Sequence, residues 1–416
     1  MAQLSDDCFA FGGALLSVEA AAALIAARVP PLEGREQVPL AAARGRVLAG
    51  DVLAPHPLPP FFNSAVDGYA FRHADLAPAG ETRLRLSGRL AAGQAAGAPL
   101  QPGTACRILT GAPMPPSADT VMMQEDARLE GAVLHLPAGL KQGANCRPAG
   151  EDVAQGSLAL AAGTRLNPAH VGLAAALGLP ALPVRRRPRV GVFSTGDELV
   201  PPGGRLGPAQ TFDSNRFTLL ALLAGLPVEP VDLGILPDHP EATAAALRAA
   251  AAAHDMLLTS GGVSAGEEDH VRGAIEASGS LVFWRLALKP GRPAAMGVVG
   301  GKPVLGLPGN PVAAVVTFLH LARPLALRLA GAEPEPLPRF VAEADFTHRK
   351  KAGRREYLRV TLASGADLPV ARRDGREGAG LLSSLTQSHA FAELPESSTA
   401  VAPGDRVTVL PFAAIL

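Results

Sequence analysis

Residues 255–270 read DMLLTSGGVSAGEEDH, an apolar run that changes abruptly into small polar residues and then into acids. DMLLTS has the length and composition of a buried strand, and a helix is predicted over 269–278. A simple surface turn would need neither the TSGG sequence at 259–262 nor three acids so close behind it. The stretch therefore predicts a buried strand that ends beside a ligand.

The segments around this strand alternate in the same way. RVGVFS and VEPVDLGIL have strand-like patterns, and HPEATAAALRAAAAAH has that of a helix. LVFWRLAL and AAMGVV predict a hairpin, and KPVLGLP leads into a helix from 311 to about 330 that Pro324 is expected to kink. Strands that alternate with helices predict an α/β domain over 185–331, with a parallel-rich sheet covered on both faces.

The rest of the chain has different textures. A helix capped by Ser17 is predicted over 14–29, and a second helix over 39–49. Short alternating runs between Gly and Pro predict a small inserted β domain over 53–147. Residues 148–184 continue the first segment as a helical and extended region, with a helix over 168–178. Residues 332–416 predict a C-terminal β domain.

The composition excludes several classes of protein. The chain of 416 residues has 38 Lys and Arg and 38 Asp and Glu, so no net charge attracts it to nucleic acid or to an anionic membrane. No signal peptide and no transmembrane span is recognisable. Cys8, Cys106 and Cys146 are widely spaced and odd in number, which fits a reducing compartment. We therefore expect a cytoplasmic protein.

Ligands of open α/β sheets bind outside the carboxyl ends of the strands. Besides TSGG, three strand ends here carry polar residues: STGDE at 194–198, Pro237-Asp238 and PGN at 308–310. Their carboxylates would repel an anion unless a divalent cation such as Mg²⁺ lay between them. Lys289 and Arg292 flank a Pro-Gly turn and can face an oxyanion. These residues predict a phosphorylated ligand with a bound metal.

Each of these signals also has a simpler explanation. Asp238 and Asp269 precede helices and could only cap them. The Gly-Gly pair could be an ordinary turn, Lys289 could be a solvated surface side chain, and Asn310 could only begin a helix. The coincidence of four similar strand ends within one domain favours the ligand site.

Taken in order, these stretches resemble the MoeA family of molybdopterin molybdenumtransferases, which is related to the gephyrin E domain. The resemblance runs from about residue 14 to the C-terminus and rests on a set of motifs: NSAVDGYAFR, RILTGAPMPPSADTVMMQED, RPAGEDV, GVFSTGDEL, LGILPDHP, LTSGGVSAGEEDH, LALKPGRP and GLPGNPVAA. It implies an elongated homodimer of four-part chains, in which residues 1–52 and 148–184 form the dimerisation domain and 332–416 a β-barrel-like domain. The implied reaction takes adenylylated molybdopterin and molybdate, requires Mg²⁺ and releases AMP.

The resemblance also implies roles for individual residues. The pterin and nucleotide would lie on Ser260, Gly261, Gly262 and Ser264, with Pro308 and Asn310 in the same site. Asp238 and Asp269 would bind the metal, and Glu198 would position water or metal. Lys289, Arg292 and Arg354 would attract molybdate. Asp67, Thr110 and Asp152 would reach the cleft from the partner subunit, although a tight turn, a strand end and an ion pair with Arg147 would also explain them.

The sequence departs from the family pattern at several positions. Phe62 replaces an acid before the NSAVDGYA motif, and Arg292 replaces a second lysine. Ala379 replaces a serine that could help to hold molybdate, unless Ser383 or Ser384 substitutes for it. Two alternatives to the transferase therefore stay open, a molybdopterin adenylyltransferase and a non-catalytic binding or scaffold paralogue. Expected partners are a MogA-type adenylyltransferase and molybdoenzyme apoproteins.

Overall fold

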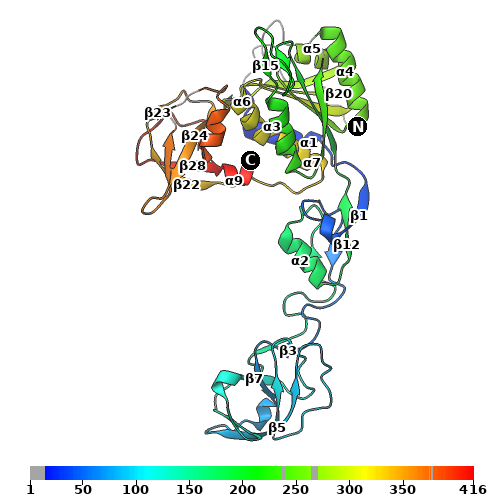
Figure 1. Cartoon of the computed structure of the whole chain (residues 1–416), viewed down its shortest axis with the longest axis vertical. Helices are drawn as coiled ribbons and strands as arrows, with labels where there is room; N and C mark the ends of the chain where they lie inside the picture. The colour runs from blue at the N-terminus through cyan, green and yellow to red at the C-terminus, as the bar shows by residue number, and fades with distance from the viewer. Residues whose placement is uncertain (1–14, 237–238, 264–269, 374, 376–377) are drawn as a thin grey trace.

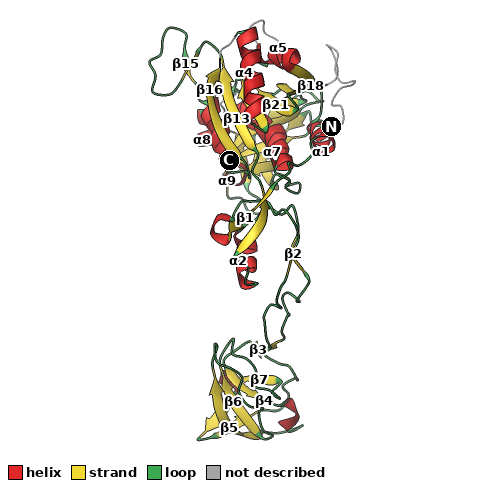
Figure 2. Ribbon diagram, turned by 90° about the vertical axis from the view of Figure 1, so that its right-hand side faces the viewer, coloured by secondary structure: helices red, strands yellow, loops and turns green. Residues whose placement is uncertain are grey.

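The computed structural model describes residues 15–236, 239–263, 270–373, 375 and 378–416. The chain is elongated (Figures 1 and 2). A broad part contains the α/β domain and the C-terminal β domain. A narrow middle part connects it to a separate domain, residues 63–147, which we call the distal β domain. This architecture of α/β and β domains confirms the predicted fold class.

The α/β domain is built on a six-stranded sheet in the order β16-β13-β17-β21-β20-β18. Four neighbouring strands are parallel, and the last two complete the sheet as the predicted antiparallel hairpin. The strands are β13 (Arg189–Thr195), β16 (Glu229–Leu236), β17 (Met256–Ser260), β18 (Gly279–Arg285), β20 (Pro293–Val299) and β21 (Lys302–Leu307). A two-stranded β14 (Leu199–Val200) and β15 (Thr211–Phe212) ribbon extends beyond β13.

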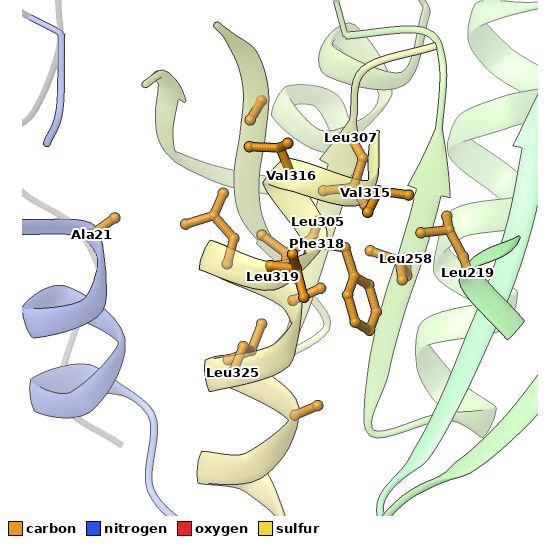
Figure 3. Close-up of a cluster of buried hydrophobic side chains, with 14 of the residues drawn as sticks. Ala21, Leu219, Leu258, Leu305, Leu307, Val315, Val316, Phe318, Leu319 and Leu325 are labelled. Atoms are coloured by element: carbon orange, nitrogen blue, oxygen red, sulfur yellow. The ribbon is translucent and has the colours of Figure 1, made fainter. Parts of the chain in front are cut away.

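Alternating side chains of these strands enter two different cores, because successive residues of a strand point to opposite faces. Leu258 and Leu305 face one core and Leu257 and Val304 the other. The second core is covered by α4 (Pro240–Ala253) and α5 (His270–Ser278). The first is covered by α1 (Val18–Arg28), α3 (Asn215–Ala224), α6 (Pro311–Thr317) and α7 (Arg323–Leu329) (Figure 3).

The predicted helix from residue 311 is a nearly continuous apolar helical segment, Pro311–Leu329. It is long enough to cross a membrane, but 83% of its most apolar window is buried inside the protein, as in a core helix. Between α6 and α7 it contains a π-helical turn, η4 (Phe318–Ala322), just before Pro324. Proline lacks the N–H of a regular helix, so the irregularity lies where the kink was predicted.

The first helix, α1, is capped by the Ser17 hydroxyl, which accepts a hydrogen bond from the Ala20 N–H at 3.1 Å. Its side chains pack with the α/β domain, whereas the predicted boundary at residue 52 groups it with 148–184. The domain boundaries themselves stay predictions. The second helix predicted over 39–49 is wrong, because only a single 3-10 turn forms, η1 (Leu40–Ala42), and Gly45 follows with a φ of 78°.

The middle part contains few elements. Helix α2 (Pro168–Ala176) is capped by Asn167, and two short antiparallel pairs accompany it. These pairs are β1 (Arg35–Pro39) with β12 (Ala181–Arg185) and β2 (Val52–Leu53) with β11 (Leu158–Leu160).

The distal β domain has a six-stranded sheet in the order β7-β4-β6-β5-β9-β8. Its strands and 3-10 turns are β4 (Gly68–Phe71), η2 (His73–Asp75), β5 (Thr82–Leu90), β6 (Thr104–Ile108), β7 (Thr120–Met123), η3 (Gln124–Asp126), β8 (Arg128–Glu130) and β9 (Val133–Leu136). The two ends of the domain meet in a short antiparallel pair, β3 (Asn63–Ser64) with β10 (Cys146–Arg147).

In the C-terminal β domain, pairing between β24 and β26 closes five strands into a barrel. Its elements are β22 (Phe340–Asp345), β24 (Arg355–Ala363), β25 (Val370–Arg373), α8 (Ser383–Gln387), β26 (Ala390–Leu394), β28 (Arg406–Pro411) and α9 (Phe412–Ile415), with a side pair of β23 (His348–Arg349) and β27 (Ala400–Val401). The short strand β19 (Leu288–Lys289) leaves the α/β domain and pairs with β24. This pairing joins the two domains.

Candidate functional site

A cavity of about 370 Å³ lies at the carboxyl edge of the α/β sheet, where ligands of such sheets bind. The ends of β13, β17 and β21 meet here, together with the N-terminus of α3 and two residues of the C-terminal β domain. The lining residues are Ser194, Thr195, Glu198, Leu199, Thr211, Phe212, Asp213, Ser214, Asn215, Ser260, Gly261, Gly309, Asn310, Pro311, Gly380 and Leu382. The structure thus brings together Glu198, Ser260, Gly261 and Asn310, as predicted.

Two glycines form the turn after β17. Gly261 and Gly262 have φ angles of 97° and 68°, in the left-handed region that favours glycine. A Cβ atom added to Gly262 would lie 2.6 Å from Cγ2 of Val271, so packing also excludes a side chain here. We call Ser260, Gly261 and Gly262 the glycine shelf. Without side chains on its two glycines, its backbone can approach a ligand closely.

The Ser260 hydroxyl, expected to hold the substrate, connects two strand ends. It donates to the Pro308 carbonyl at 3.1 Å and accepts from Nδ2 of Asn215 at 2.8 Å. The residue is only 3% exposed. A hydroxyl has one hydrogen, and that of Ser260 is already used. Ser260 therefore links the glycine shelf to the residue that follows β21, Pro308. Its contact with a ligand stays a prediction.

Thr195, the last residue of β13, is a site residue that the sequence analysis did not select. It is 3% exposed and lines the cavity, and its Oγ1 has no hydrogen-bond partner among the described residues. A Cβ on Gly262 would lie 3.0 Å from this oxygen, so the hydroxyl is beside the glycine shelf. Buried polar atoms without a partner are rare and costly, which favours a ligand contact at this atom. Its position in STGDE, at a strand end, was the available signal.

The DSNR sequence at 213–216 contributes a second group that the sequence analysis did not select. Ser214 is the N-cap residue of α3, but the Asp213 carboxylate accepts the Arg216 N–H at 3.3 Å. Asp213 also accepts from the Ser194 hydroxyl at 3.0 Å and from Nε of Arg216 at 2.7 Å. Arg216 reaches Asp232 of β16 as well. This buried network joins α3 to β13 and β16.

Glu198 lies at the exposed rim of the cavity. Its carboxylate folds back over Gly196, where a Cβ would overlap it. Of the three acids predicted to lie together, Glu198 is the one that the structure describes. The other two acids, Asp238 and Asp269, lie outside the described residues, as does Ser264.

Lys289 and Arg354 come together where the α/β and C-terminal β domains join. Nζ of Lys289 lies 3.1 Å from Oε2 of Glu356, a carboxylate with a side-chain exposure of 1%. Burial lowers the pKa of Lys350, and the nearby charges of Arg354 and Lys289 lower it further, against the opposing effect of Glu356 and Glu396. Lys289 and Arg354 therefore both lie near Lys350, and Lys289 is also paired with the Glu356 carboxylate.

Arg292 is exposed, three residues beyond Lys289. The turn between them packs on α6, because a Cβ on Gly291 would lie 2.5 Å from Oγ1 of Thr317. Helix α6 begins at the cavity, with Asn310 as its N-cap residue and Pro311 in its first turn. We call residues 289–292 the cation turn. It is thus connected to the cavity through one helix, α6.

Asp67 and Thr110 lie together in the distal β domain. The Thr110 hydroxyl and N–H donate to Oδ1 of Asp67 at 2.7 Å and 2.8 Å. These hydrogen bonds, from the side chain first and then from the backbone, lower the pKa of Asp67. Asp152 shares a cavity of about 480 Å³ with Arg147, but the described residues form no ion pair between the two. Within one chain the distal β domain, which contains Asp67 and Thr110, lies at the opposite end of the molecule from the α/β domain (Figure 1).

The departure at Phe62 has a structural explanation, whereas nothing in the structure explains the alanine at 379. Phe62 packs against the core of the distal β domain, so an apolar side chain is useful at this position. The Ala379 carbonyl accepts the Val312 N–H at 3.0 Å and so contacts the start of α6. Ser384 is fully buried and its hydroxyl donates to the Leu381 carbonyl at 2.5 Å, whereas Ser383 is exposed. Replacement of the missing serine by either residue stays a prediction.

Comparisons with known proteins agree along the whole chain. Residues 16–178 match the model of the MoeA N-terminal region (domain I and II), residues 191–328 that of a probable molybdopterin binding domain, and residues 341–412 that of the MoeA C-terminal region (domain IV). A Haemophilus influenzae protein named molybdopterin molybdenumtransferase is 36% identical over 401 residues, which cover 96% of this chain and 99% of that protein.

A second relative, molybdopterin molybdenumtransferase 2 of Mycobacterium tuberculosis, is 37% identical over 384 residues, or 89% of this chain and 94% of that protein. The crystal structure of a molybdopterin biosynthesis MoeA protein from Pyrococcus horikoshii OT3 superimposes with a TM-score of 0.82 at 30% identity. The match covers 96% of this chain and 100% of that one.

Proposed function

The chain belongs to the MoeA family, and on that premise we propose that the cavity at the edge of its α/β sheet binds the substrate of a molybdopterin molybdenumtransferase. The protein is such an enzyme and acts in molybdenum cofactor biosynthesis by inserting molybdenum. The predicted function and enzyme class are confirmed at this level. The substrates' positions and the residues that act on them are proposals.

The observation that supports this placement best is the buried Thr195 hydroxyl beside the glycine shelf. A phosphate has oxygen acceptors for a hydroxyl, and a glycine turn can offer backbone N–H groups with no side chain in the way. The pterin and nucleotide parts of adenylylated molybdopterin would therefore lie on Ser260, Gly261, Gly262 and Ser264, with Pro308 and Asn310 in the same site. In the proposed reaction, AMP is released from this part of the cavity.

Molybdate is a dianion and requires local positive charge in a chain with no net charge. Lys289, Arg292 and Arg354 would supply it. Two observations support this assignment: Lys289 and Arg354 both lie near Lys350, and the turn that carries Lys289 and Arg292 packs on the helix that begins at the cavity. Arg292 can also donate two parallel hydrogen bonds to an oxyanion, which a lysine cannot.

Several oxygen atoms that could bind a metal line the cavity, and oxygen ligands suit Mg²⁺. They include the Glu198 carboxylate and the Thr195 hydroxyl. We propose that Asp238 and Asp269 hold the ion and that Glu198 positions a water or the metal. When bound, Mg²⁺ would offset the negative charge of the substrate phosphates. Thr195 and Glu198 would then orient the phosphate and water on its protein side.

The distal residues are proposed to act in a homodimer. Asp67 and Thr110 belong to the distal β domain and Asp152 follows it in sequence, and Asp67 is already ordered by two hydrogen bonds. In a dimer with twofold symmetry, each distal β domain could reach the cavity of the partner subunit. Such an arrangement would give both ends of the chain a place in one site.

The cellular setting is likewise proposed. We propose that the enzyme works in the cytoplasm, receives its substrate from a MogA-type adenylyltransferase and serves molybdoenzyme apoproteins, without binding nucleic acid or a membrane. The neutral charge balance supports the last point. Adenylylation of molybdopterin is not favoured as this chain's own reaction, because the relatives that match it over nearly its whole length are named for molybdenum transfer. A non-catalytic paralogue is supported only by Phe62 and Ala379.

An assay of AMP release tests the proposal. The protein is incubated with adenylylated molybdopterin and Mg²⁺, with molybdate or with sulfate as a control dianion of the same shape, and AMP is measured by chromatography. We expect AMP release that depends on molybdate. Release without molybdate, or binding without release, would contradict the proposed reaction. Formation of adenylylated molybdopterin from molybdopterin and ATP would support the adenylyltransferase instead.

A further inference from the structure

One amide group connects three segments at the cavity. Nδ2 of Asn215 donates to Oγ of Ser260 at 2.8 Å and to the carbonyl oxygen of Gly309 at 2.6 Å. Ser260 belongs to the glycine shelf, and Gly309 to the loop that follows the neighbouring strand β21, which already contacts Ser260 through Pro308. Asn215 itself is the first residue of α3. Its side chain therefore fixes the start of α3 against two adjacent strand ends at the cavity.

The orientation of this amide follows from its partners. A carbonyl oxygen can only accept a hydrogen bond, so the atom that faces Gly309 must be the NH₂ group of Asn215. The Ser260 hydroxyl donates to Pro308, so it must accept from the second hydrogen of the same NH₂ group. Both hydrogens of the Asn215 NH₂ group are thus used, one by Ser260 and one by Gly309.

The position of Asn215 is itself fixed by the residues on either side of it. Asp213 and Arg216 are 2% and 5% exposed and bind each other at 2.7 Å. Asp213 is held by Ser194 of β13, and Arg216 by Asp232 of β16. Through DSNR, α3 is therefore connected to β13, β16 and β17 and to the loop that follows β21.

We propose that Asn215 is a positioning residue, which holds the start of α3 against the glycine shelf and the adjacent Pro308–Gly309 loop in the arrangement that the nucleotide part of the substrate requires. This inference rests on the proposed function of the cavity. Asn215 acts through Ser260 and Gly309, and need not touch the reacting atoms. Its loss should weaken nucleotide binding and leave the concentration of molybdate needed for half-maximal rate unchanged, because the cations lie on other elements.

AMP binding to the full-length protein provides the test, measured by titration calorimetry in a buffer with Mg²⁺. For Asn215→Ala we expect roughly tenfold weaker AMP binding, from the loss of two hydrogen bonds of modest net strength. Asn215→Asp keeps the shape but replaces the donor by a charged acceptor beside the Gly309 carbonyl, so we expect a larger loss. In turnover, both variants should raise the half-saturating concentration of adenylylated molybdopterin more than that of molybdate.

Thr218→Ala is the matched control, since its hydroxyl donates to the Ser214 carbonyl within the same helix, one turn from the cavity. Thermal unfolding of all variants separates binding from loss of fold. If wild-type protein does not bind AMP, the proposed function of the cavity fails and the inference with it. If wild type binds AMP and folded Asn215→Ala and Asn215→Asp bind it equally well, the inference alone is overturned.

Discussion

The α/β cavity and the distal β domain each contain a carboxylate fixed by a hydroxyl group, but in contrasting surroundings. Asp213 is 2% exposed, and both of its oxygens accept hydrogen bonds from Ser194 and Arg216. Asp67 lies at a partly exposed surface, and the described hydrogen bonds use only its Oδ1. Asp213 can only support its neighbours, whereas Asp67 is oriented and still accessible to another molecule.

Asp213 thus has a structural role in its site, whereas Asp67 still has an oxygen atom that a ligand or a second subunit could contact. Buried networks such as Asp213-Arg216 keep a fixed geometry because a broken pair would leave a charge without a partner. A carboxylate ordered by one threonine at the surface has no such constraint. Substitutions in each region, and one mixture of two variants, can show whether the contrast holds and whether the two regions act in one site.

The first prediction joins the two regions directly. Asp67→Ala and Asp269→Ala chains should each lose nearly all AMP release as homodimers, because each lacks one half of the site. After subunit exchange, a mixture should recover up to roughly a quarter of wild-type activity, because half of the dimers then contain one intact site of two. AMP release is measured before and after mixing. Confirmed exchange without recovery would contradict a shared site.

The second prediction concerns the cation turn beside the α/β cavity. Arg292→Ala should raise the half-saturating concentration of molybdate by roughly ten- to hundredfold, since a hydrogen bond to a charged group contributes about 1.5–3 kcal/mol. AMP affinity should barely change. Arg406→Ala, which removes an exposed arginine of the barrel, controls for net charge. Superimposable molybdate titrations for wild type and Arg292→Ala would show that the turn does not bind the oxyanion.

The third prediction distinguishes ligand contact from stability at Thr195. Thr195→Val removes a buried hydroxyl that has no partner among the described residues, so the free energy of unfolding should rise by about 1 kcal/mol while AMP release falls by about tenfold. Thr259→Val is the matched control, because the Thr259 hydroxyl is also buried without a partner among those residues but does not line the cavity. It should stabilise the protein and leave AMP release intact. Equal activity of both variants would remove Thr195 from the site.

The fourth prediction addresses the distal carboxylate. The Thr110 hydroxyl lowers the pKa of Asp67 below 3.8, so Thr110→Val should raise it. Because the folded-state pKa is the lower one, the stabilising contribution of this contact is complete above the unfolded-state pKa and disappears as the pH falls through the folded-state value. Carboxyl-carbon NMR titration measures the shift. Thr104→Val, whose hydroxyl donates to the Gln101 carbonyl, should leave the titration of Asp67 unchanged; an equal shift in both variants would exclude a specific Thr110 contact.

The sequence predicted those parts of the fold that depend on local patterns. The apolar strands and their small polar ends located the sheet and its carboxyl edge, and Pro324 marked an irregular helix. Asn215 could not be predicted in the same way, because its partners are 45 and 94 residues away in sequence. LVFWRLAL gave no sign that Leu288–Lys289 leaves its sheet for β24 of another domain. Such features depend on tertiary contacts, which override local preference.

The paired strands β3 and β10 have a consequence for the history of this chain. They bring Ser64 opposite Cys146 and Asn63 opposite Arg147, so the inserted segment enters and leaves its host at one place. A segment whose two ends are adjacent can be gained, lost or exchanged as a cassette without disturbing the fold that carries it. Recombination between related chains at these two junctions would transplant Asp67 and Thr110 together, as one heritable unit.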